Sequence, residues 1–547
     1  MTATTGAEIL ARQIRDEGVE DMFYLMGGPI IETAGFAKQH GIRTIDVRHE
    51  QAAAMAAHGY ARVKGQPGVC LAASGPATTN LLTGIANAYL DGVPVVALGG
   101  AAGFAAFETD AFQEYDQLSM AKPVTRWASR ATHARRLPEF FNMAYRKARG
   151  PKPGPTYLDL PGNILSEKID DESVHFPPGG MVASRPGPDP AEIAKAIELL
   201  RTAERPLVIT GSGIIWSGAS PELREFIDAT KIPFYTTPQG RGVVPEDHEV
   251  AFLGARTKAF READVALVVG TRLSFIIGQA AAPRWARDLK VIHVDIDSSE
   301  IGHNRAADIG IVSDARLALR ALTDAAKGAG LSAPQGWLAS LGETDQSRRT
   351  KTLELADSDR SPIHPLRVAN AIVNSVERDA IVSVDGHGTL GFARQWIPAF
   401  VPGARLNPGP NGCMGVGLPH AMGAAVAAPG RQVVAFVGDG SFLMNVQELD
   451  TMVRHRLPIV IIINNNGGWT PFPDTTPGRV LGKSQRYEDI AVALGGHGSF
   501  VDKSADVEPA VKSALELAAR DQKPVVVNVH VDEHASPDST TSFGTYQ

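Results

Sequence analysis

The chain has 547 residues, of which 44% are hydrophobic and 21% are charged, and its net charge is -7. This length exceeds one ordinary core and predicts two to four domains, with three fitting well. The charge is spread without a basic stripe, so nucleic acid is not an expected partner. Cys70 and Cys413 are too few for a disulfide framework, and no segment reads as an export signal or a membrane span. We therefore expect a cytoplasmic protein without a membrane partner.

Residues 1–165 alternate short apolar strands with helices. Strands are predicted at 21–25, 44–47, 69–72, 95–98 and 156–160. The alternation predicts a parallel α/β unit. The stretch from 163 to 190 contains Pro and Gly and has little helical pattern, so it is interpreted as a linker.

Two further units follow. Residues 190–325 carry strands predicted at 206–210, 233–235, 265–269 and 291–295, and polar residues 325–362 are read as a second crossing. The last unit, 362–533, has strands predicted at 380–384, 433–437 and 459–463. The tail, 534–547, is read as a mobile end, with a lid as the alternative. The predicted fold class is α/β, with three doubly wound parallel-sheet domains.

The stretch 438–469 holds the strongest chemical signal. A β-branched strand ends at Gly438-Asp439-Gly440, a helix is predicted over 442–453 from apolar residues three and four apart, and Asn466 follows the next strand. One helical crossover would make the two strands parallel neighbours. Asp439 and Asn466 are thereby predicted at the carboxyl edge of a sheet, where ligands bind in such folds.

A hard divalent cation such as Mg²⁺ takes about six oxygen ligands, only some of them from protein. The Asp439 carboxylate, the Asn466 amide oxygen and the Gly468 carbonyl would supply three, and phosphate oxygens and water the others. The amides of Gly440 and Ser441 would face the phosphates at the start of the helix. Either motif alone is equally well interpreted as a surface turn. Together, at this spacing, they predict a diphosphate and metal site.

A Gly-Asp-Gly followed after a fixed interval by paired asparagines resembles the signature of thiamin diphosphate enzymes. The resemblance implies thiamin diphosphate and Mg²⁺ as cofactors. It implies Asp439, Asn466 and Gly468 as metal ligands, with Gly438 and Trp469 in the same cofactor site. The three domains would then be pyrimidine-binding, central, and diphosphate-binding.

Arg48-His49-Glu50 begins a helix directly after the strand 44–47. A glutamate in a first helical turn is ordinarily just a dipole partner. Thiamin enzymes, however, place an Arg-His-Glu here, which implies that Glu50 hydrogen-bonds N1′ of an aminopyrimidine held by the neighbouring subunit. A carboxyl with a raised pKa would share that proton and favour the reactive imino tautomer. This role requires a homodimer at minimum, and a homotetramer is typical of the family.

Two glycine-rich loops complete the expected cofactor site. In 407–419 the family pattern implies that Met414 wedges the cofactor into a bent shape and that Gly412 offers a carbonyl to its 4′-amine. Gly386-His387-Gly388 follows a strand and would add amides to the diphosphate. Each loop alone is only a common way to enter a helix.

A polar, aromatic loop, 108–115, follows the strand 95–98. Such a stretch is most often only a loop. Its Ala-Phe-Gln-Glu core resembles the substrate loop of acetolactate synthases, benzaldehyde lyases and 2-hydroxyacyl-CoA lyases. The resemblance implies that Gln113 contacts the substrate as a catalytic residue, with Phe112 and Tyr115 shaping the pocket. Pro29 stands where benzaldehyde lyases have a catalytic histidine.

The middle unit is the most discriminating part of the sequence. Residues 271–277 and 238–245 resemble 2-hydroxyacyl-CoA lyases, and 271–277 lacks the Arg-Phe-Asp-Asp of acetolactate synthases, so bound FAD is not expected. In the lyase branch the central domain binds ADP. The candidate ADP residues are Gly211, Arg272, Asp295, Ile296 and Asp314. Capping of the next element explains the aspartates at 295 and 297 equally well.

The sequence thus resembles a thiamin diphosphate-dependent 2-hydroxyacyl-CoA lyase over essentially its full length. The expected reaction cleaves a 2-hydroxyacyl-CoA reversibly into formyl-CoA and an aldehyde or ketone, so acyl-CoA and a small carbonyl compound are the expected partners. The alternatives are an oxalyl-CoA decarboxylase, an acetolactate-synthase-like carboligase, and a non-catalytic thiamin diphosphate-binding protein.

Overall fold

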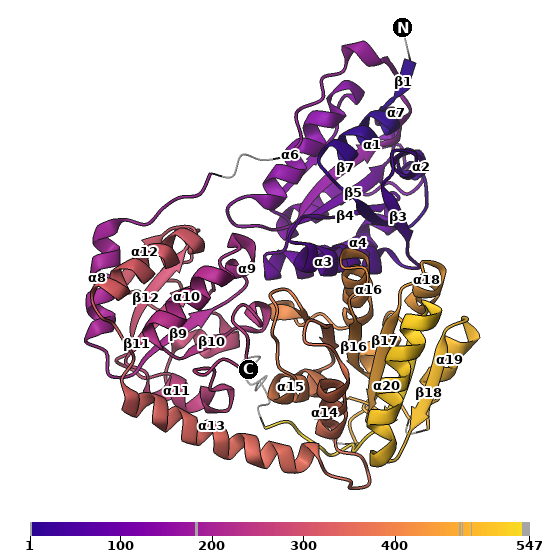
Figure 1. Ribbon diagram of the computed structural model, residues 1–547. Helices are drawn as coiled ribbons and strands as arrows, with labels where there is room; N and C mark the ends of the chain where they lie inside the picture. Colours follow the sequence, from indigo (N-terminus) through magenta and orange to yellow (C-terminus); the bar gives the residue numbers. More distant parts are fainter. Residues whose placement is uncertain (1–2, 181–183, 470–471, 473, 483, 539–547) are drawn as a thin grey trace.

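The computed structural model describes residues 3–180, 184–469, 472, 474–482 and 484–538. It has three parallel sheets that follow one another along the chain, each flanked by helices (Figure 1). The predicted α/β class with three doubly wound parallel-sheet domains is confirmed. Among the described residues, no helix is both long and apolar enough to cross a membrane.

The first sheet has six parallel strands in the order β3-β2-β4-β5-β7-β6. These strands are β2 (Asp21–Tyr24), β3 (Arg43–Asp46), β4 (Gly68–Ala72), β5 (Val95–Ala101), β6 (Trp127–Arg130) and β7 (Thr156–Pro161). The helices are α1 (Gly6–Asp16), α2 (Ile31–Gln39), α3 (Glu50–Lys64), α4 (Pro76–Asp91), α5 (Gln117–Ala121), α6 (Leu137–Arg149) and α7 (Gly162–Ser166). A small antiparallel pair joins β1 (Ala3–Thr5) to β8 (Lys168–Asp170), and β8 lies within the predicted linker and shortens it.

The middle sheet has five parallel strands in the order β10-β9-β11-β12-β13. They are β9 (Pro206–Thr210), β10 (Phe234–Thr236), β11 (Val265–Val269), β12 (Lys290–Asp295) and β13 (Ile309–Val312). Helices α8 (Pro190–Arg201), α9 (Gly213–Ser217), α10 (Ser220–Thr230), α11 (Arg256–Glu262) and α12 (Ala315–Gly328) flank them.

The third sheet has six parallel strands in the order β15-β14-β16-β17-β19-β18. They are β14 (Ile381–Asp385), β15 (Arg405–Leu406), β16 (Val433–Gly438), β17 (Ile459–Asn465), β18 (His497–Val501) and β19 (Val525–His530). The helices are α14 (Pro365–Ser375), α15 (His387–Trp396), α16 (Gly417–Ala427), α17 (Asp439–Leu443), α18 (Glu448–Arg454), α19 (Tyr487–Ala493) and α20 (Ser504–Asp521). The central strands are buried and mostly apolar because helices cover both faces of the sheet, and the polar residues of β17 stand at its carboxyl end.

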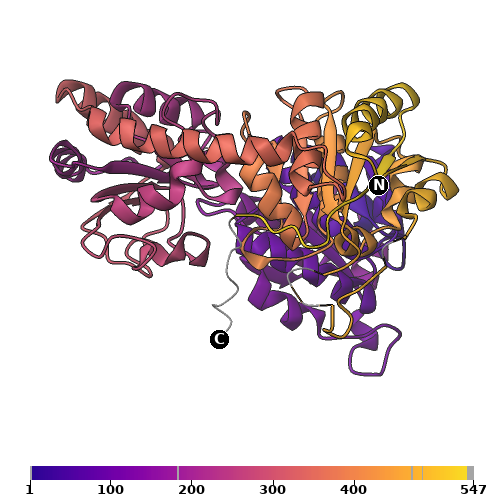
Figure 2. The same ribbon diagram turned by 90° about the horizontal axis from the view of Figure 1, so that it is seen from below.

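Two predictions of secondary structure were wrong. The helix predicted over 442–453 is broken into α17 and α18, because residues 444–447 turn between them. The polar stretch 325–362 contains a 22-residue helix, α13 (Gln335–Ala356), which contacts both α14 and the turn Leu253–Ala255 of the middle unit. Figure 2 shows α13 running from the middle unit toward the third.

Helices α3 and α16 form the main contact between the first and third units. A Cβ on Gly59 would lie 2.5 Å from the His420 carbonyl oxygen, and one on Gly423 would lie 2.0 Å from the Ala56 carbonyl oxygen. Glycine at both positions therefore lets the two helix backbones touch. His58 of α3 and His420 of α16 meet in this contact, with ring centroids 4.5 Å apart and both side chains fully buried.

This histidine pair predicts acid sensitivity of the fold. Burial lowers the pKa of His58, and it lowers that of His420 to about 3. The unfolded chain therefore binds more protons than the folded one below about pH 6.5, so stability falls as pH drops through that value. Between pH 7 and pH 5, His420 should account for about 2 kcal/mol of this loss.

We predict that His420→Gln loses less unfolding free energy between these two pH values than the wild type does, as measured by urea denaturation. The exposed His534 is the control position, and His534→Gln should keep the wild-type pH dependence. If the unfolding free energy of His420→Gln fell between pH 7 and pH 5 by as much as that of the wild type, His420 would not be a source of the acid sensitivity.

Candidate active site

Three strands of the third sheet end side by side at its carboxyl edge. Asp385 of β14 pairs with Val437 of β16, and Gly438 pairs with Asn464 of β17. The turns after these strands therefore gather Gly386, Asp439 and Asn466 at one place. The parallel register of the strands produces this convergence from residues far apart in the chain.

The Asp439 carboxylate is the most constrained group at this edge. Asp439 is buried, and its Oδ1 accepts a hydrogen bond of 2.8 Å from the Gly440 amide. Its Oδ2 is buried without a hydrogen-bond partner. Burial raises the pKa of the carboxyl to about 6, while the nearby amides of Gly440, Gly468 and Gly467 lower it. A buried carboxylate oxygen without a partner is a suitable ligand for a cation.

Glycines keep the space around this carboxylate small. Gly386 has φ +96°, and a Cβ on it would lie 3.1 Å from the Gly438 nitrogen and 3.2 Å from the Ser441 hydroxyl. A Cβ on Gly440 would lie 2.3 Å from the ring of Trp469. The backbone amides at these turns are therefore accessible only because no side chain covers them.

The residues at this edge fit a magnesium diphosphate. Asp439, which is buried, would contribute one carboxylate, half-buried Asn466 an amide oxygen, and Gly468 a carbonyl. Among the described residues, no group of three His, Cys, Asp or Glu side chains is placed to hold a metal ion. A site with one carboxylate and neutral oxygens leaves coordination positions for phosphate oxygens, as Mg²⁺ sites do.

Comparison with known proteins agrees with this geometry. Residues 4–120 match the Thiamine pyrophosphate enzyme, N-terminal TPP binding domain, residues 193–322 the central domain, and residues 377–529 the C-terminal TPP binding domain. The chain belongs to the thiamine pyrophosphate enzyme family. Its first and third units are therefore thiamine pyrophosphate-binding domains, and Mg²⁺ is the metal typical of the family.

Relatives within the thiamine pyrophosphate enzymes carry different activities in their names. The chain is 34% identical over 540 residues to a probable acetolactate synthase of Mycobacterium bovis, covering 96% of this chain and 95% of the relative. It is 33% identical over 557 residues to a 2-hydroxyacyl-CoA lyase of Arabidopsis thaliana, covering 98% and 96%. It is 31% identical over 557 residues to the oxalyl-CoA decarboxylase of Escherichia coli, covering 98% and 96%. The comparisons thus place the chain in this group of enzymes without choosing among their reactions.

The other predicted cofactor residues lie around the same sheet. His387 and Gly388 begin α15, directly after Gly386, so that helix starts at the expected diphosphate. Gly412, with φ +62°, and half-buried Met414 lie in the loop before α16. Their contacts with the cofactor remain predictions from the family pattern.

Glu50 lies in the first turn of α3, as predicted, where it is the first helical residue, and it is 8% exposed. Its Oε2 accepts a hydrogen bond of 2.9 Å from Asn80 Nδ2 on α4. The start of α3 is also attached to the third unit, because Glu448 of α18 accepts hydrogen bonds of 3.0 and 3.2 Å from the Arg48 amide. Burial raises the pKa of Glu448 to about 7. Glu448 thus fixes the backbone next to Glu50 from another domain.

The predicted substrate residues lie at the carboxyl edge of the first sheet. Gln113 Oε1 accepts a hydrogen bond of 2.9 Å from the Ser74 hydroxyl in the turn after β4. Phe112 is 86% exposed and Tyr115 is also exposed. Pro29 packs against Gly100 and Gly162: a Cβ on Gly100 would clash with its ring at 2.4 Å, and one on Gly162 would lie 3.1 Å from it. The structure thus brings Gln113 close to the turn at the start of α4, whereas Phe112 and Tyr115 face outward.

A cavity of about 310 Å³ lies between the first and middle units. Of the predicted ADP residues, Arg272, Asp295, Ile296 and Asp314 line this cavity, while Gly211 packs beside Thr271 and Gly240. Burial raises the pKa of Asp295 to about 6. Asp295 also accepts the Asp297 amide at 2.9 Å, so the turn-capping interpretation holds as well. ADP binding in this cavity stays a prediction.

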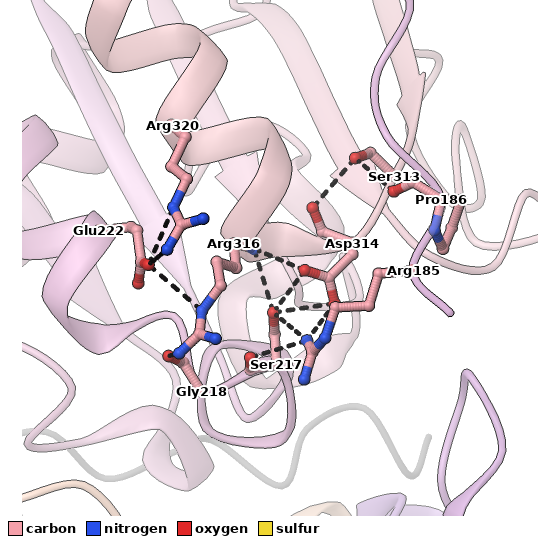
Figure 3. A network of polar contacts seen from close by, with 9 residues as sticks. All are labelled: Arg185, Pro186, Ser217, Gly218, Glu222, Ser313, Asp314, Arg316 and Arg320. Carbon is pink, nitrogen blue, oxygen red and sulfur yellow. Dashed lines mark hydrogen bonds and ion pairs between the residues drawn. The ribbon is translucent and has the colours of Figure 1, made fainter. Parts of the chain in front are cut away.

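Asp314 has structural partners of its own (Figure 3). Its carboxylate accepts hydrogen bonds from Ser217 Oγ at 3.0 Å and from the Arg316 amide at 3.0 Å, and forms an ion pair of 2.6 Å with Arg185. It therefore caps α12 and anchors the linker before α8. These contacts occupy both oxygens and favour a structural role for Asp314 over the predicted contact with ADP.

Sequence reasoning did not identify Asn80, Glu448 or Ser74. Each acts through hydrogen bonding to a residue distant in the chain, and a Glu in a first helical turn or a Ser before a helix is usual in any protein. No signal in the sequence alone marks such partners.

We predict that Asp439→Asn weakens binding of thiamine pyrophosphate with Mg²⁺ by more than about 100-fold, because the variant removes the charged metal ligand. Isothermal titration calorimetry on the purified protein measures this. Asp489→Asn, at an exposed position on α19, is the matched control and should bind like the wild type. Equal affinities of the Asp439→Asn variant and the wild type would contradict the metal assignment.

Proposed function

We propose that this protein is a thiamine pyrophosphate- and Mg²⁺-dependent lyase that cleaves 2-hydroxyacyl-CoA into formyl-CoA and an aldehyde or ketone, and that also catalyses the reverse condensation. The middle-unit resemblance of 271–277 to such lyases and the similarity to the Arabidopsis thaliana enzyme support it. The observation that carries the proposal is a group of arginines around the end of α15 opposite the expected diphosphate site.

The arginine group comprises Arg256 of α11, Arg284 of the middle unit and Arg394 of α15. Burial, together with the positive charges of Arg394 and Arg284, lowers the pKa of Arg256 to about 9. Arg256 Nε and Nη2 are buried without a hydrogen-bond partner. Guanidinium groups that repel one another in a partly buried place favour an anionic ligand, and phosphate is the ligand that Arg prefers.

The position of this group suits coenzyme A. Helix α15 begins at the expected diphosphate site, and Arg394 lies seven residues after His387, which is about 10 Å along a helix. A pantetheine arm is long enough to connect phosphates at the arginines with a thioester at the cofactor. Pyruvate, with a single carboxylate, gives no reason for three arginines at this distance.

The residues of the chain then have defined roles. The bound cofactor would supply an electron sink for the carbanion left when the C–C bond breaks. The buried Glu50 carboxyl would hold a proton at N1′ of the aminopyrimidine. The cofactor concerned would be bound by the partner chain of a homodimer or a homotetramer. Gln113 would hydrogen-bond the oxygen of the carbonyl product, and the exposed Phe112 and Tyr115 would line its pocket.

An acetolactate-synthase-like carboligase is the second candidate. The chain is 37% identical over 566 residues to a probable acetolactate synthase large subunit of Methanocaldococcus jannaschii, covering 96% of this chain and 92% of the relative. An oxalyl-CoA decarboxylase would use the same arginines, because its substrate is also a CoA thioester.

The proposed function is tested by giving the purified enzyme a 2-hydroxyacyl-CoA, oxalyl-CoA and pyruvate in separate reactions, with mass detection of products. We predict formyl-CoA and a matching aldehyde or ketone from the first substrate, with Asp439→Asn as the inactive control. Turnover of pyruvate alone would overturn the lyase proposal, and formyl-CoA from oxalyl-CoA alone would indicate the decarboxylase.

For the arginine group, we predict that Arg256→Gln raises KM for the acyl-CoA about 10-fold with little change in kcat, because one charge-assisted phosphate contact is lost. The exposed Arg261 on the same helix gives the control, and Arg261→Gln should match the wild type. A 2-hydroxyacyl-pantetheine lacks the nucleotide phosphates, so its KM should be the same for the wild type, Arg256→Gln and Arg261→Gln. The same KM increase with pantetheine would contradict a phosphate contact.

A further inference from the structure

The loop between β5 and α5 contains three residues in an unusual backbone conformation. Glu108, Asp110 and Gln113 have φ of 58°, 56° and 58°. Side chains other than glycine rarely adopt this left-handed region, because their Cβ crowds the backbone. Such residues persist only where surrounding contacts hold them. The loop therefore needs a specific interaction that fixes it.

Glu114 supplies that interaction. Its Oε1 accepts a hydrogen bond of 2.7 Å from the Glu108 amide, and its Oε2 accepts one of 3.1 Å from the Ala111 amide. The Glu114 amide in turn donates to the Ala111 carbonyl at 3.1 Å. One carboxylate thus joins the two sides of the turn, and both of its partners are N–H donors.

The clamped turn presents the residues assigned to the carbonyl substrate. Phe112 projects from it at 86% exposure. Gln113 follows directly, and its side chain reaches the Ser74 hydroxyl at 2.9 Å. A Cβ on Gly75 would lie 2.4 Å from the Gln113 carbonyl oxygen, so the turn rests directly on the backbone at the start of α4. Phe112 and Gln113 are therefore held between Glu114 on one side and the Ser74–Gly75 turn on the other.

We propose that Glu114 is the positioning residue of the carbonyl-substrate pocket. Its carboxylate fixes the backbone from which Phe112 and Gln113 project, and so it sets which aldehyde or ketone is accepted without touching that molecule. This inference rests on the proposed function for the placement of the carbonyl substrate beside Gln113.

The interaction requires a carboxylate. A glutamine at 114 keeps the size of the side chain, but its NH₂ group would face one of the two backbone N–H groups, and one of the hydrogen bonds would be lost. Glu108 provides a control in the same turn, because its amide is clamped whereas its own carboxylate takes part in no hydrogen bond or ion pair among the described residues. Glu108→Gln therefore removes the same charge and leaves the clamp intact.

The test compares Glu114→Gln, Glu108→Gln and the wild type as full-length holoenzymes in the condensation of formyl-CoA with aldehydes of different size. For Glu114→Gln we expect kcat/KM for the preferred aldehyde to be about 10- to 100-fold lower, since small displacements of a positioning group have effects of this size. The ratio of kcat/KM between the preferred aldehyde and the other aldehydes should also become smaller. H/D exchange at C2 of the bound cofactor and the melting temperature should be unchanged. Glu108→Gln should behave like the wild type.

Limited proteolysis by chymotrypsin gives a second measurement that needs no substrate. Cleavage after Phe112, located by mass spectrometry, should be faster in Glu114→Gln than in Glu108→Gln. If none of the proteins condenses formyl-CoA, the proposed function fails, but faster cleavage still supports the clamp. Equal cleavage rates, or aldehyde selectivity in Glu114→Gln that equals the wild type, would overturn the inference.

Discussion

The burial of the Asp439 carboxylate at the end of β16 is the constraint on which the site depends. A carboxylate oxygen buried without a partner is costly, and here Oδ2 is in that state. The three parallel strands that end at this edge force it there, and the glycines beside it leave no side chain to satisfy it. The nearby amides and Arg479 offset this charge only in part, and a bound metal cation would balance it further, so the fold and the cofactor chemistry are linked.

The position of Glu50 depends on the third unit as well as on its own. Helix α3 starts at Glu50, packs against α16 through glycine contacts, and is held at its start by Glu448 of α18. Because α17 and α18 follow the metal-binding turn directly, Glu50, which would act on the partner's cofactor, is connected through packed elements to the turn that would bind this chain's own metal. The middle unit is attached to the third unit through α13, and to the first unit through the hydrogen bond that Gln239 donates to Asp91.

The sequence allowed the fold class, the strand ends and the residues of the thiamine pyrophosphate signature to be predicted, because strand periodicity and short motifs are local. Prediction from the sequence failed where tertiary contacts determine the local structure. Apolar residues at helical spacing continue across residues 444–447, so the turn between α17 and α18 was not visible in the sequence. Helix α13 was missed because few of its 22 residues are buried and it therefore lacks an apolar stripe. The clamp by Glu114 depends on backbone conformations that no residue pattern reveals.

We propose that Glu50 of one chain acts on the cofactor bound at Asp439 of its partner. Subunits carrying Glu50→Gln are mixed with subunits carrying Asp439→Asn after dissociation, and the reassembled protein is assayed. Because a mixed dimer would contain one site without either substitution, and half of randomly reassembled dimers are mixed, we predict recovery of about one quarter of wild-type activity from two inactive parents. No recovery, with mixed dimers shown to form, would contradict it.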